Sequence, residues 1–259
     1  MSAFARVLAG VDGTNWGFEA LRQALLLAPE SAEVRAVTVL DTAPAVHTGL
    51  QAAHFTELLT EEAEQARATA QTILDGRPRT DARVVRGKPV DVLRHERDEL
   101  DTTLLALGGR RSSRFLGILL GDTGTELLHD AACSVLLAYP AAEGAWAPRK
   151  IVVGLDSSGH AEAALRTADQ LADRFDGSVE VVAATGGKPV EADAAWAGRV
   201  QTWDPASPVE ALVERSREVD LVVVGSRGVT GLRTIGSVSE RVAHQAHCTV
   251  LVVHEPSPA

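Results

Sequence analysis

Short apolar runs alternate with longer amphipathic segments along the first half of the chain. The apolar runs predict five strands, at residues 6–12, 33–40, 82–87, 102–109 and 134–140. Apolar positions at helical spacing predict four helices between them, near residues 17–28, 51–75, 89–99 and 123–131. The strand segments are apolar at consecutive positions, which indicates strands covered on both faces of a parallel sheet. We therefore expect a five-stranded, doubly wound α/β domain with right-handed connections.

The same pattern occurs twice, because three blocks of the first half recur in the same order in the second. The pairs are "RVLAGVDGTNWGFEALRQALLLA" from Arg6 with "KIVVGLDSSGHAEAALRTADQLA" from Lys150, "TLLALGGR" from Thr103 with "DLVVVGSR" from Asp220, and "DAACSVLLAYP" from Asp130 with "QAHCTVLVVHE" from Gln245. Such self-similarity indicates a tandem duplication. The predicted fold is two tandem α/β domains, residues 1–142 and 148–259, joined by the Pro, Gly and Ala-rich seam "YPAAEGAWAPRK".

The second domain is expected to be the shorter one. Between Asp156 and Gly225 it has 27 residues fewer than the first domain has between Asp12 and Gly108. The missing piece corresponds to the long amphipathic segment near 51–75. One face of the second sheet is therefore predicted to be partly bare or covered by its neighbour. Trp196 and Trp203 are expected to fill space there, most simply as ordinary core aromatics.

Composition narrows the class of protein. The formal net charge of -10 argues against a nucleic-acid surface, which needs clustered Lys and Arg. Two cysteines in 259 residues form no disulfide framework and favour a reducing compartment. Nowhere do 18 uncharged apolar residues run together, and the N-terminus has no long apolar segment. We expect a cytoplasmic protein with no nucleic-acid or membrane partner.

Candidate binding chemistry lies in "GSRGVTGLRTIGSVS", residues 225–239. Gly225 would end the fourth strand of the second domain and Asp156 the first, so both lie at the sheet edge where doubly wound folds bind ligands. A glycine-rich loop that opens a helix presents backbone N–H groups and a positive helix dipole to an anion. These parts suit a nucleotide. The alternative is a flexible turn followed by a helix cap, with Ser237 or Ser239 as the capping residue.

Both halves resemble the universal stress protein family, related to adenine-nucleotide alpha-hydrolase-like folds, whose ATP-binding members carry G-x2-G-x9-G-[ST] after strand four and an Asp after strand one. The second half keeps most of these groups but has seven residues between its second and third glycines. The resemblance implies nucleotide binding by Asp156, Gly225, Gly228, Gly236, Ser237, Val238 and Ser239. The first half keeps the nine-residue spacing of this motif, but Arg111 replaces the second glycine and Asp122 replaces the Ser or Thr. Its degenerate site comprises Asp12, Gly108, Arg111, Gly121 and Asp122.

The charge beside the expected phosphate position predicts which half binds nucleotide more tightly. A carboxylate about 4 Å from a phosphate charge costs about 4 kcal/mol at an effective dielectric of roughly 20, which is nearly a thousandfold in affinity. Asp122 therefore disfavours ATP in the first half. We expect Arg111 to fill that pocket and to pair with Asp122 or Asp12 in place of a ligand. Nucleotide is expected mainly in the second domain.

No catalytic or metal site is expected. Thr123 with His129, and His160 near Asp156, lack the third member of a hydrolase triad. The "HQAHC" segment suggests soft metal ligands in His244, His247 and Cys248. However, Cys248 aligns with Cys133 before the last strand, where a small apolar residue would pack.

The leading hypothesis is a stress-response or regulatory protein that binds ATP, with or without magnesium, and has no dedicated catalysis. One alternative is a nucleotide-independent dimerising scaffold, and another is a weak ATP hydrolase. The resemblance implies that "SVLLAY" and "TVLVVHE", the last strands of the two domains, pair within the chain. A homodimer of two such chains is also expected.

Overall fold

The structure is a computed structural model that describes most of the chain. The described residues are 4–43, 52–111, 118–119, 121–141, 144–155, 159–184, 200, 202–204, 207–226 and 237–254. The chain divides by packing into two compact units, Met1–Gly108 with Gly121–Leu127 and Gly109–Leu120 with Leu128–Ala259.

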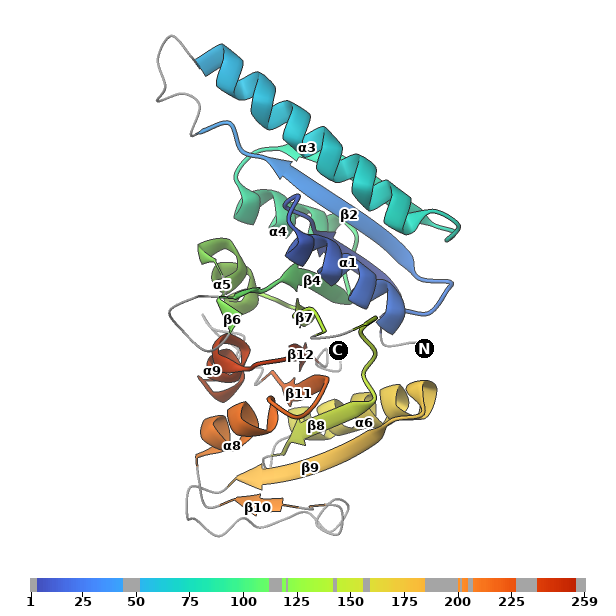
Figure 1. Ribbon diagram of the computed structural model, residues 1–259, viewed down its shortest axis with the longest axis vertical. Coiled ribbons are helices and arrows are strands. Elements are labelled where there is room, and N and C mark those ends of the chain that lie inside the picture. The colour runs from blue at the N-terminus through green and yellow to red at the C-terminus, as the bar shows by residue number, and fades with distance from the viewer. Residues whose placement is uncertain are drawn as a thin grey trace. The chain divides into compact units, whose positions relative to one another are not determined.

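The first unit is a parallel sheet with helices on both faces. Its strands are β1 (Arg6–Gly10), β2 (Glu33–Leu40), β3 (Thr80–Arg86) and β4 (Leu104–Gly108). Its helices are α1 (Asn15–Leu27), α3 (Ala52–Leu74), α4 (Pro89–Glu99) and most of α5 (Asp122–His129). The strand order is β4-β1-β2-β3 and every pairing is parallel. In Figure 1, α1 and α3 lie together on one face and α4 lies on the other. The doubly wound α/β fold is confirmed.

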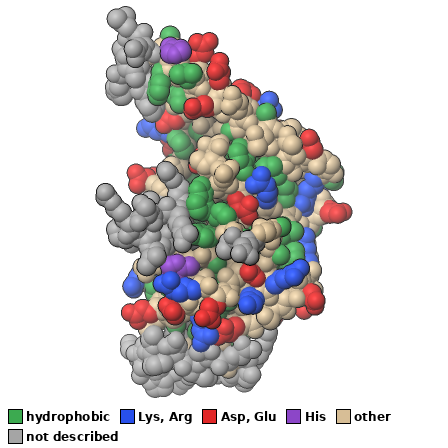
Figure 2. Space-filling model, in the orientation of Figure 1, with side chains coloured by type: hydrophobic (Ala, Val, Ile, Leu, Met, Phe, Trp, Pro, Cys, Tyr) green, Lys and Arg blue, Asp and Glu red, His purple; other side chains and the backbone are tan. Residues whose placement is uncertain are grey.

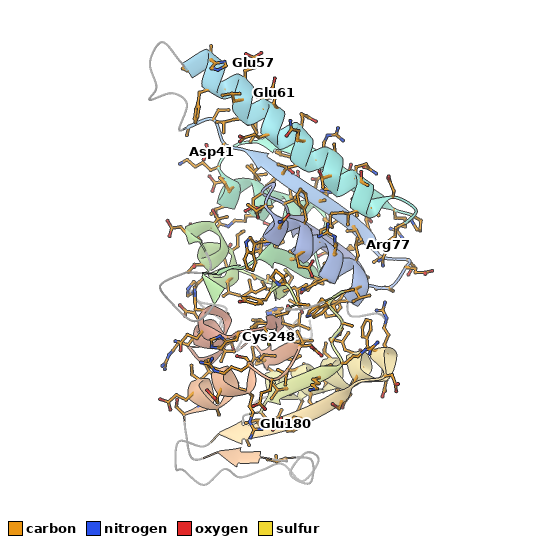
Figure 3. All side chains as sticks on the ribbon, in the orientation of Figure 1. Asp41, Glu57, Glu61, Arg77, Glu180 and Cys248 are labelled. Carbon is orange, nitrogen blue, oxygen red and sulfur yellow. The ribbon has the colours of Figure 1, made fainter. Side chains whose placement is uncertain are left out.

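Burial explains why these segments form a covered sheet. The three central residues of β1 and the first four of β4 are buried, as strands with helices on both sides require. Helix α3 packs on β2 and β3 and buries a stripe of Ala63, Ala66, Ala70 and Leu74. On its first turns, Glu57 and Glu61 are exposed and point away from the sheet (Figure 3). Phe55 and Leu58 are also exposed at this end, where Figure 2 shows apolar side chains at the surface.

Helix α1 is capped at both ends. Thr14 accepts a hydrogen bond from the Gly17 N–H at its start. At its end, the Arg77 guanidinium donates to the carbonyl oxygens of Leu25 at 2.6 Å and Ala28 at 3.0 Å, and also to that of Pro29. Figure 3 shows Arg77 just beyond the end of α3. A cation at this position satisfies the last carbonyl groups of α1 and complements its dipole.

The second unit contains the shorter repeat together with the last strand of the first. Its strands are β5 (Arg110–Arg111), β6 (Ile118–Leu119), β7 (Ser134–Ala138), β8 (Lys150–Gly154), β9 (Ser178–Ala184), β10 (Thr202–Asp204), β11 (Leu221–Gly225) and β12 (Thr249–Val253). Its helices are α6 (Gly159–Phe175), α8 (Pro208–Arg215) and α9 (Ser237–Gln245). The main sheet runs β10-β9-β8-β11-β12-β7, and all of its pairings are parallel except that of β12 with β7. The second α/β domain is thus confirmed as five parallel strands.

The helices of this unit cover its sheet unevenly. Helix α6 packs on β8, β11 and β12, while α8 and α9 pack against each other on the other face. Helix α8 begins with a capping box in which Ser207 and Glu210 satisfy one another's backbone N–H groups. Trp196 and the side chain of Trp203, which were expected to fill the shortened face, lie outside the described residues.

Strands β7 and β12 form an antiparallel ladder centred on Leu136 opposite Leu251. These two leucines correspond to each other in the repeat alignment, so the ladder has a local pseudo-twofold axis. Hydroxyl groups repeat this symmetry. The Thr249 hydroxyl accepts from the Tyr139 N–H at 3.0 Å, and the Ser134 hydroxyl accepts from the His254 N–H at 3.1 Å. This ladder places β7 in the second compact unit, whereas the predicted limits 1–142 and 148–259 follow the sequence repeat and stay a prediction.

A small hairpin was not predicted. Strands β5 and β6 pair antiparallel, with Arg110 opposite Leu119 and Arg111 opposite Ile118. Strand β6 packs against α9. The pattern "RRSSRFLGILLG" is too short and irregular to show strand periodicity, so contact with another element decides its conformation.

Candidate functional site

The candidate site of the second half lies at the carboxyl ends of β8 and β11, where the strand order reverses direction. Gly225 ends β11, and α9 begins at Ser237. Asp156, Gly228 and Gly236 lie outside the described residues, as does the side chain of Ser237. Val238 and Ser239 lie in the first turn of α9. The structure therefore places the two ends of the glycine-rich loop at the expected edge of the sheet.

Gly225 has a packing role that needs no ligand. A Cβ atom built on it would lie 2.5 Å from the carbonyl oxygen of His160, in the first turn of α6. The first half repeats this contact, since a Cβ on Gly108 would lie 2.7 Å from the carbonyl oxygen of Trp16 in α1. Only glycine permits so close an approach of strand end and helix. The contact is present in both halves, so Gly225 alone does not distinguish a binding half from a degenerate one.

Ser239 ties the two ends of the loop together. Its buried hydroxyl donates to the carbonyl oxygen of Gly225 at 2.7 Å. This bond fixes the start of α9 against the end of β11 and occupies the hydroxyl proton. Among the described residues, the backbone N–H groups of the first turn of α9, which a helix cannot satisfy internally, are available to an anion.

A carboxylate in the same turn is paired. Glu240 lies 3.0 Å from Nε2 of His129, the last residue of α5. His244, one turn along α9, has its pKa lowered by burial and by the charge of His129, although Glu240 acts in the opposite direction. His129 and His244 correspond in the repeat alignment. The carboxylate of Glu240 is thus engaged by the ring of a neighbouring histidine.

The corresponding edge of the first half carries two exposed carboxylates, Asp12 and Asp122. Asp12 is exposed, and its carboxylate accepts from the N–H of Thr14 at 3.1 Å and from its hydroxyl at 2.6 Å. Asp122 is the exposed first residue of α5, where its charge complements the helix dipole. Gly121 accepts from the Thr125 N–H. The side chain of Arg111 lies outside the described residues, so its pairing with Asp122 or Asp12 stays a prediction.

Comparison with known proteins decides the family. The sequence model of the Universal stress protein family matches residues 3–138 and 191–254. The chain belongs to this family. Universal stress protein Rv2623 of Mycobacterium tuberculosis is 30% identical over 187 residues, which cover 60% of this chain and 62% of that protein. A Mycolicibacterium smegmatis universal stress protein is 30% identical over 186 residues, 60% of this chain and 63% of that protein. These matches span less than two thirds of the curated relatives.

Solved structures agree on the architecture. A universal stress protein from Archaeoglobus fulgidus superposes with a TM-score of 0.71 and covers 98% of each chain at 18% sequence identity. At this identity the likeness shows the fold alone. The tandem arrangement of two universal stress protein domains inferred from the sequence is confirmed.

Sequence reasoning missed a polar cluster beside this site, formed by His160, Ser226 and His254. Ser226 follows β11, and His254 follows β12. The Ser226 hydroxyl lies 3.1 Å from Nδ1 of His254. His160 was considered only as a hydrolase residue with Asp156. The available signal was position, because each of these residues lies at the carboxyl end of a predicted strand or at the start of the following helix.

Other candidate groups have structural surroundings. Cys133 and Cys248 are buried thiols that are not part of a disulfide, and burial raises the pKa of the Cys248 thiol, which Figure 3 labels. Within the described ranges, no three His, Cys, Asp or Glu side chains gather as metal ligands. Across the same part of the chain, no helix combines the length and the apolar character needed to cross a bilayer.

Proposed function

We propose that this universal stress protein is a regulatory protein of the stress response that binds ATP in its second half. Family membership supports a stress-response role. The observation that carries the binding proposal is the start of α9, which lies at the strand-order switch and is fixed there by the bond from Ser239 to Gly225. At the position of Asp122 in α5, α9 has the uncharged Ser237.

Phosphate recognition would come from backbone groups and helix polarity. The first turn of α9 offers N–H groups and the positive end of a nine-residue helix to an anion. Asp156, at the end of β8, is proposed to bind the nucleoside part, and Gly228 and Gly236 to let the loop approach the phosphates. Magnesium would bind through the phosphates.

We propose no dedicated catalysis. The Ser239 hydroxyl already donates to a backbone carbonyl. The Ser226 hydroxyl lies 3.1 Å from Nδ1 of His254, but Ser226 is buried, and among the described residues no third group bonds to the His254 ring to complete a triad. Ligand occupancy would therefore act by changing the conformation or assembly of the protein. The expected cytoplasmic location stays a prediction.

The test is calorimetric titration with ATP, with and without magnesium, of the full chain and two variants. Ser237→Asp copies Asp122 at the matching position of the second half, and a carboxylate at a helix start favours folding. Its charge is expected to weaken ATP binding by about a thousandfold, since it costs about 4 kcal/mol beside a phosphate. Ser237→Asn adds similar bulk without charge and is expected to retain most of the affinity.

The outcomes separate the hypotheses. Binding of one ATP per chain that is lost in Ser237→Asp supports the proposal. No heat at millimolar ATP in the unaltered protein would favour the nucleotide-independent scaffold. Release of many phosphate ions per protein molecule would instead favour an ATP hydrolase.

We also propose that two chains, where they associate, use surfaces other than the edge of β12. Both edges of this strand are already paired, with β11 and with β7. A second chain could not add to β12 without displacing β7. Light scattering of the full chain and of a Leu136→Lys variant tests this. A dimer of the unaltered protein that is lost in the Leu136→Lys variant would contradict the proposal.

A further inference from the structure

Each half of the chain holds an ion pair at the same place, between the second strand of the repeat and the helix that precedes the fourth strand. In the first half, the guanidinium of Arg35 in β2 lies 2.8 Å from the carboxylate of Glu96 in α4. In the second half, the carboxylate of Glu180 in β9, which Figure 3 labels, lies 2.9 Å from the guanidinium of Arg215 in α8. The acid and the base have therefore exchanged places between the two halves.

The strand registers show that the two strand positions are equivalent. Arg35 lies opposite Leu8 of β1, and Glu180 lies opposite Val152 of β8. Leu8 and Val152 correspond to each other in the repeat alignment. Arg35 and Glu180 thus occupy the same position of the repeated sheet.

The helix starts show the same equivalence for the other two partners. Helix α4 begins at Pro89 and α8 at Pro208, and Glu96 and Arg215 each lie seven residues further along their helix. Helix α4 packs on β1 and β2, as α8 packs on the corresponding strands β8 and β9. Both ion pairs therefore join the same helix face to the same strand, with opposite polarity.

The pair in the first half is well shielded from water. The side chains of Arg35 and Glu96 are 12% and 5% exposed. Glu96 also lies 3.4 Å from Arg83 of β3, and Arg35 lies 2.9 Å from Glu99, the last residue of α4. The pair in the second half is more exposed, at 27% and 35%. Charges that are partly removed from water interact more strongly, so a like charge at either place would be unfavourable.

Tandem repeats can misassemble when a segment of one repeat takes the place of its counterpart during folding. Here the helix segments "PVDVLRHE" and "PVEALVER" are similar, as are the following strand segments "TLLALGGR" and "DLVVVGSR". If α4 and β4 assembled with the second sheet, Glu96 would face Glu180. If α8 and β11 assembled with the first sheet, Arg215 would face Arg35. The reversed polarity makes both exchanges unfavourable.

We propose that this reversed ion pair directs each helix to its own sheet and so prevents the two repeats from exchanging segments during folding. Apolar packing discriminates less, because the residues that α4 buries include Val92 and Leu93, while α8 buries Ala211 and Leu212 at the matching positions. The same reversal opposes exchange of these segments between two chains. It acts on assembly and is independent of nucleotide binding.

The test gives both halves the same polarity. In the full chain, Glu180→Arg with Arg215→Glu keeps two opposite charges at this place but orients them as in the first half. The matched control is Glu214→Arg with Arg217→Glu, which reverses an exposed ion pair of the same unit and leaves the composition and net charge unaltered. Each protein is unfolded in urea and refolded by dilution at several protein concentrations. Circular dichroism and size-exclusion chromatography with light scattering measure the yield of the native species.

We expect Glu180→Arg with Arg215→Glu to refold with a severalfold lower yield than the unaltered protein, and the control to refold as the unaltered protein does. A loss that does not depend on protein concentration would indicate exchange within the chain, and a loss that grows with concentration would indicate exchange between chains. Either result supports the inference. Equal yields of the two variants would overturn it.

Equilibrium unfolding in urea separates misassembly from a loss of stability. Yields are compared under conditions in which this measurement shows every variant to be folded. If Glu180→Arg with Arg215→Glu is not folded under any such condition, Glu180→Gln with Arg215→Gln replaces it. The two amides remove the charge discrimination without placing a like charge beside either helix, so a smaller fall in yield is expected. A yield equal to that of the control would then overturn the inference.

Discussion

The two halves of the chain place the same backbone at the sheet edge and different side chains around it. Gly108 and Gly225 both permit close contact between the fourth strand of the repeat and its first helix. The helix that follows begins with Asp122 in one half and Ser237 in the other. Trp16 and Tyr139 of the first half are replaced by His160 and His254. The shared residues serve packing, and the differing ones change which charged and hydrogen-bonding side chains lie at this edge of the sheet.

This difference shows how a duplicated domain can specialise. The last strands pair across a local pseudo-twofold axis, and this pairing needs the apolar strands and two hydroxyls rather than a ligand. A half that no longer binds nucleotide can therefore still complete the structure of the other. Glu240 of α9, which is paired with His129 of α5, is a further group that one repeat supplies to the other.

Restoring the family's nucleotide motif in the first half is expected to change ATP binding more than any other variant below. The double variant Arg111→Gly, Asp122→Ser recreates the family motif at its natural spacing. Loss of the carboxylate removes an unfavourable interaction of about 4 kcal/mol with a phosphate, so the first half is expected to gain measurable ATP affinity. Calorimetry should then count two nucleotides per chain. An unchanged stoichiometry would show that more than charge separates the halves.

Glycine substitution tests what the halves share. A methyl group at Gly225 or Gly108 would overlap backbone atoms of α6 or α1, so Gly225→Ala and Gly108→Ala should each lower the free energy of unfolding by about 3 kcal/mol. Urea denaturation followed by circular dichroism measures the loss. Gly121→Ala is the control, because nothing lies within 4 Å of a Cβ built there. A large loss at Gly225 alone would contradict a common packing role.

The smallest expected effect is a difference in stability between variants of the two hydroxyls that bond across the β7–β12 ladder. The Thr249 side chain is fully buried and both accepts from the Tyr139 N–H and donates to the Tyr139 carbonyl. Thr249→Val removes both of these bonds and should cost about 2 kcal/mol, whereas Ser134→Ala removes one bond and should cost about 1 kcal/mol. Thermal unfolding of both variants checks the order. Equal losses would mean that the second bond of Thr249 contributes nothing.

Most elements could be predicted because their periodicity is local. The second strand was expected at 33–40 and is observed at Glu33–Leu40, and the long helix expected near 51–75 spans Ala52–Leu74. The helix expected near 17–28 begins slightly earlier, at Asn15, because Thr14 caps it. The β5–β6 hairpin was missed because its stability depends on packing against α9 rather than on its own sequence. Of the candidate site, the ends of the loop were placed correctly at the sheet edge.

The sequence by itself determined the duplication, the order of strands and helices, and the edge of the sheet where a ligand could bind. Apolar periodicity and repeated blocks carry this information, since each is a property of neighbouring positions along the chain. Only the tertiary structure decided which polar groups meet. Arg77 reaches the end of α1, Ser239 reaches Gly225, and Ser226 reaches His254 across 28 positions. These contacts join segments that are distant in sequence, and a local pattern has no means of specifying them.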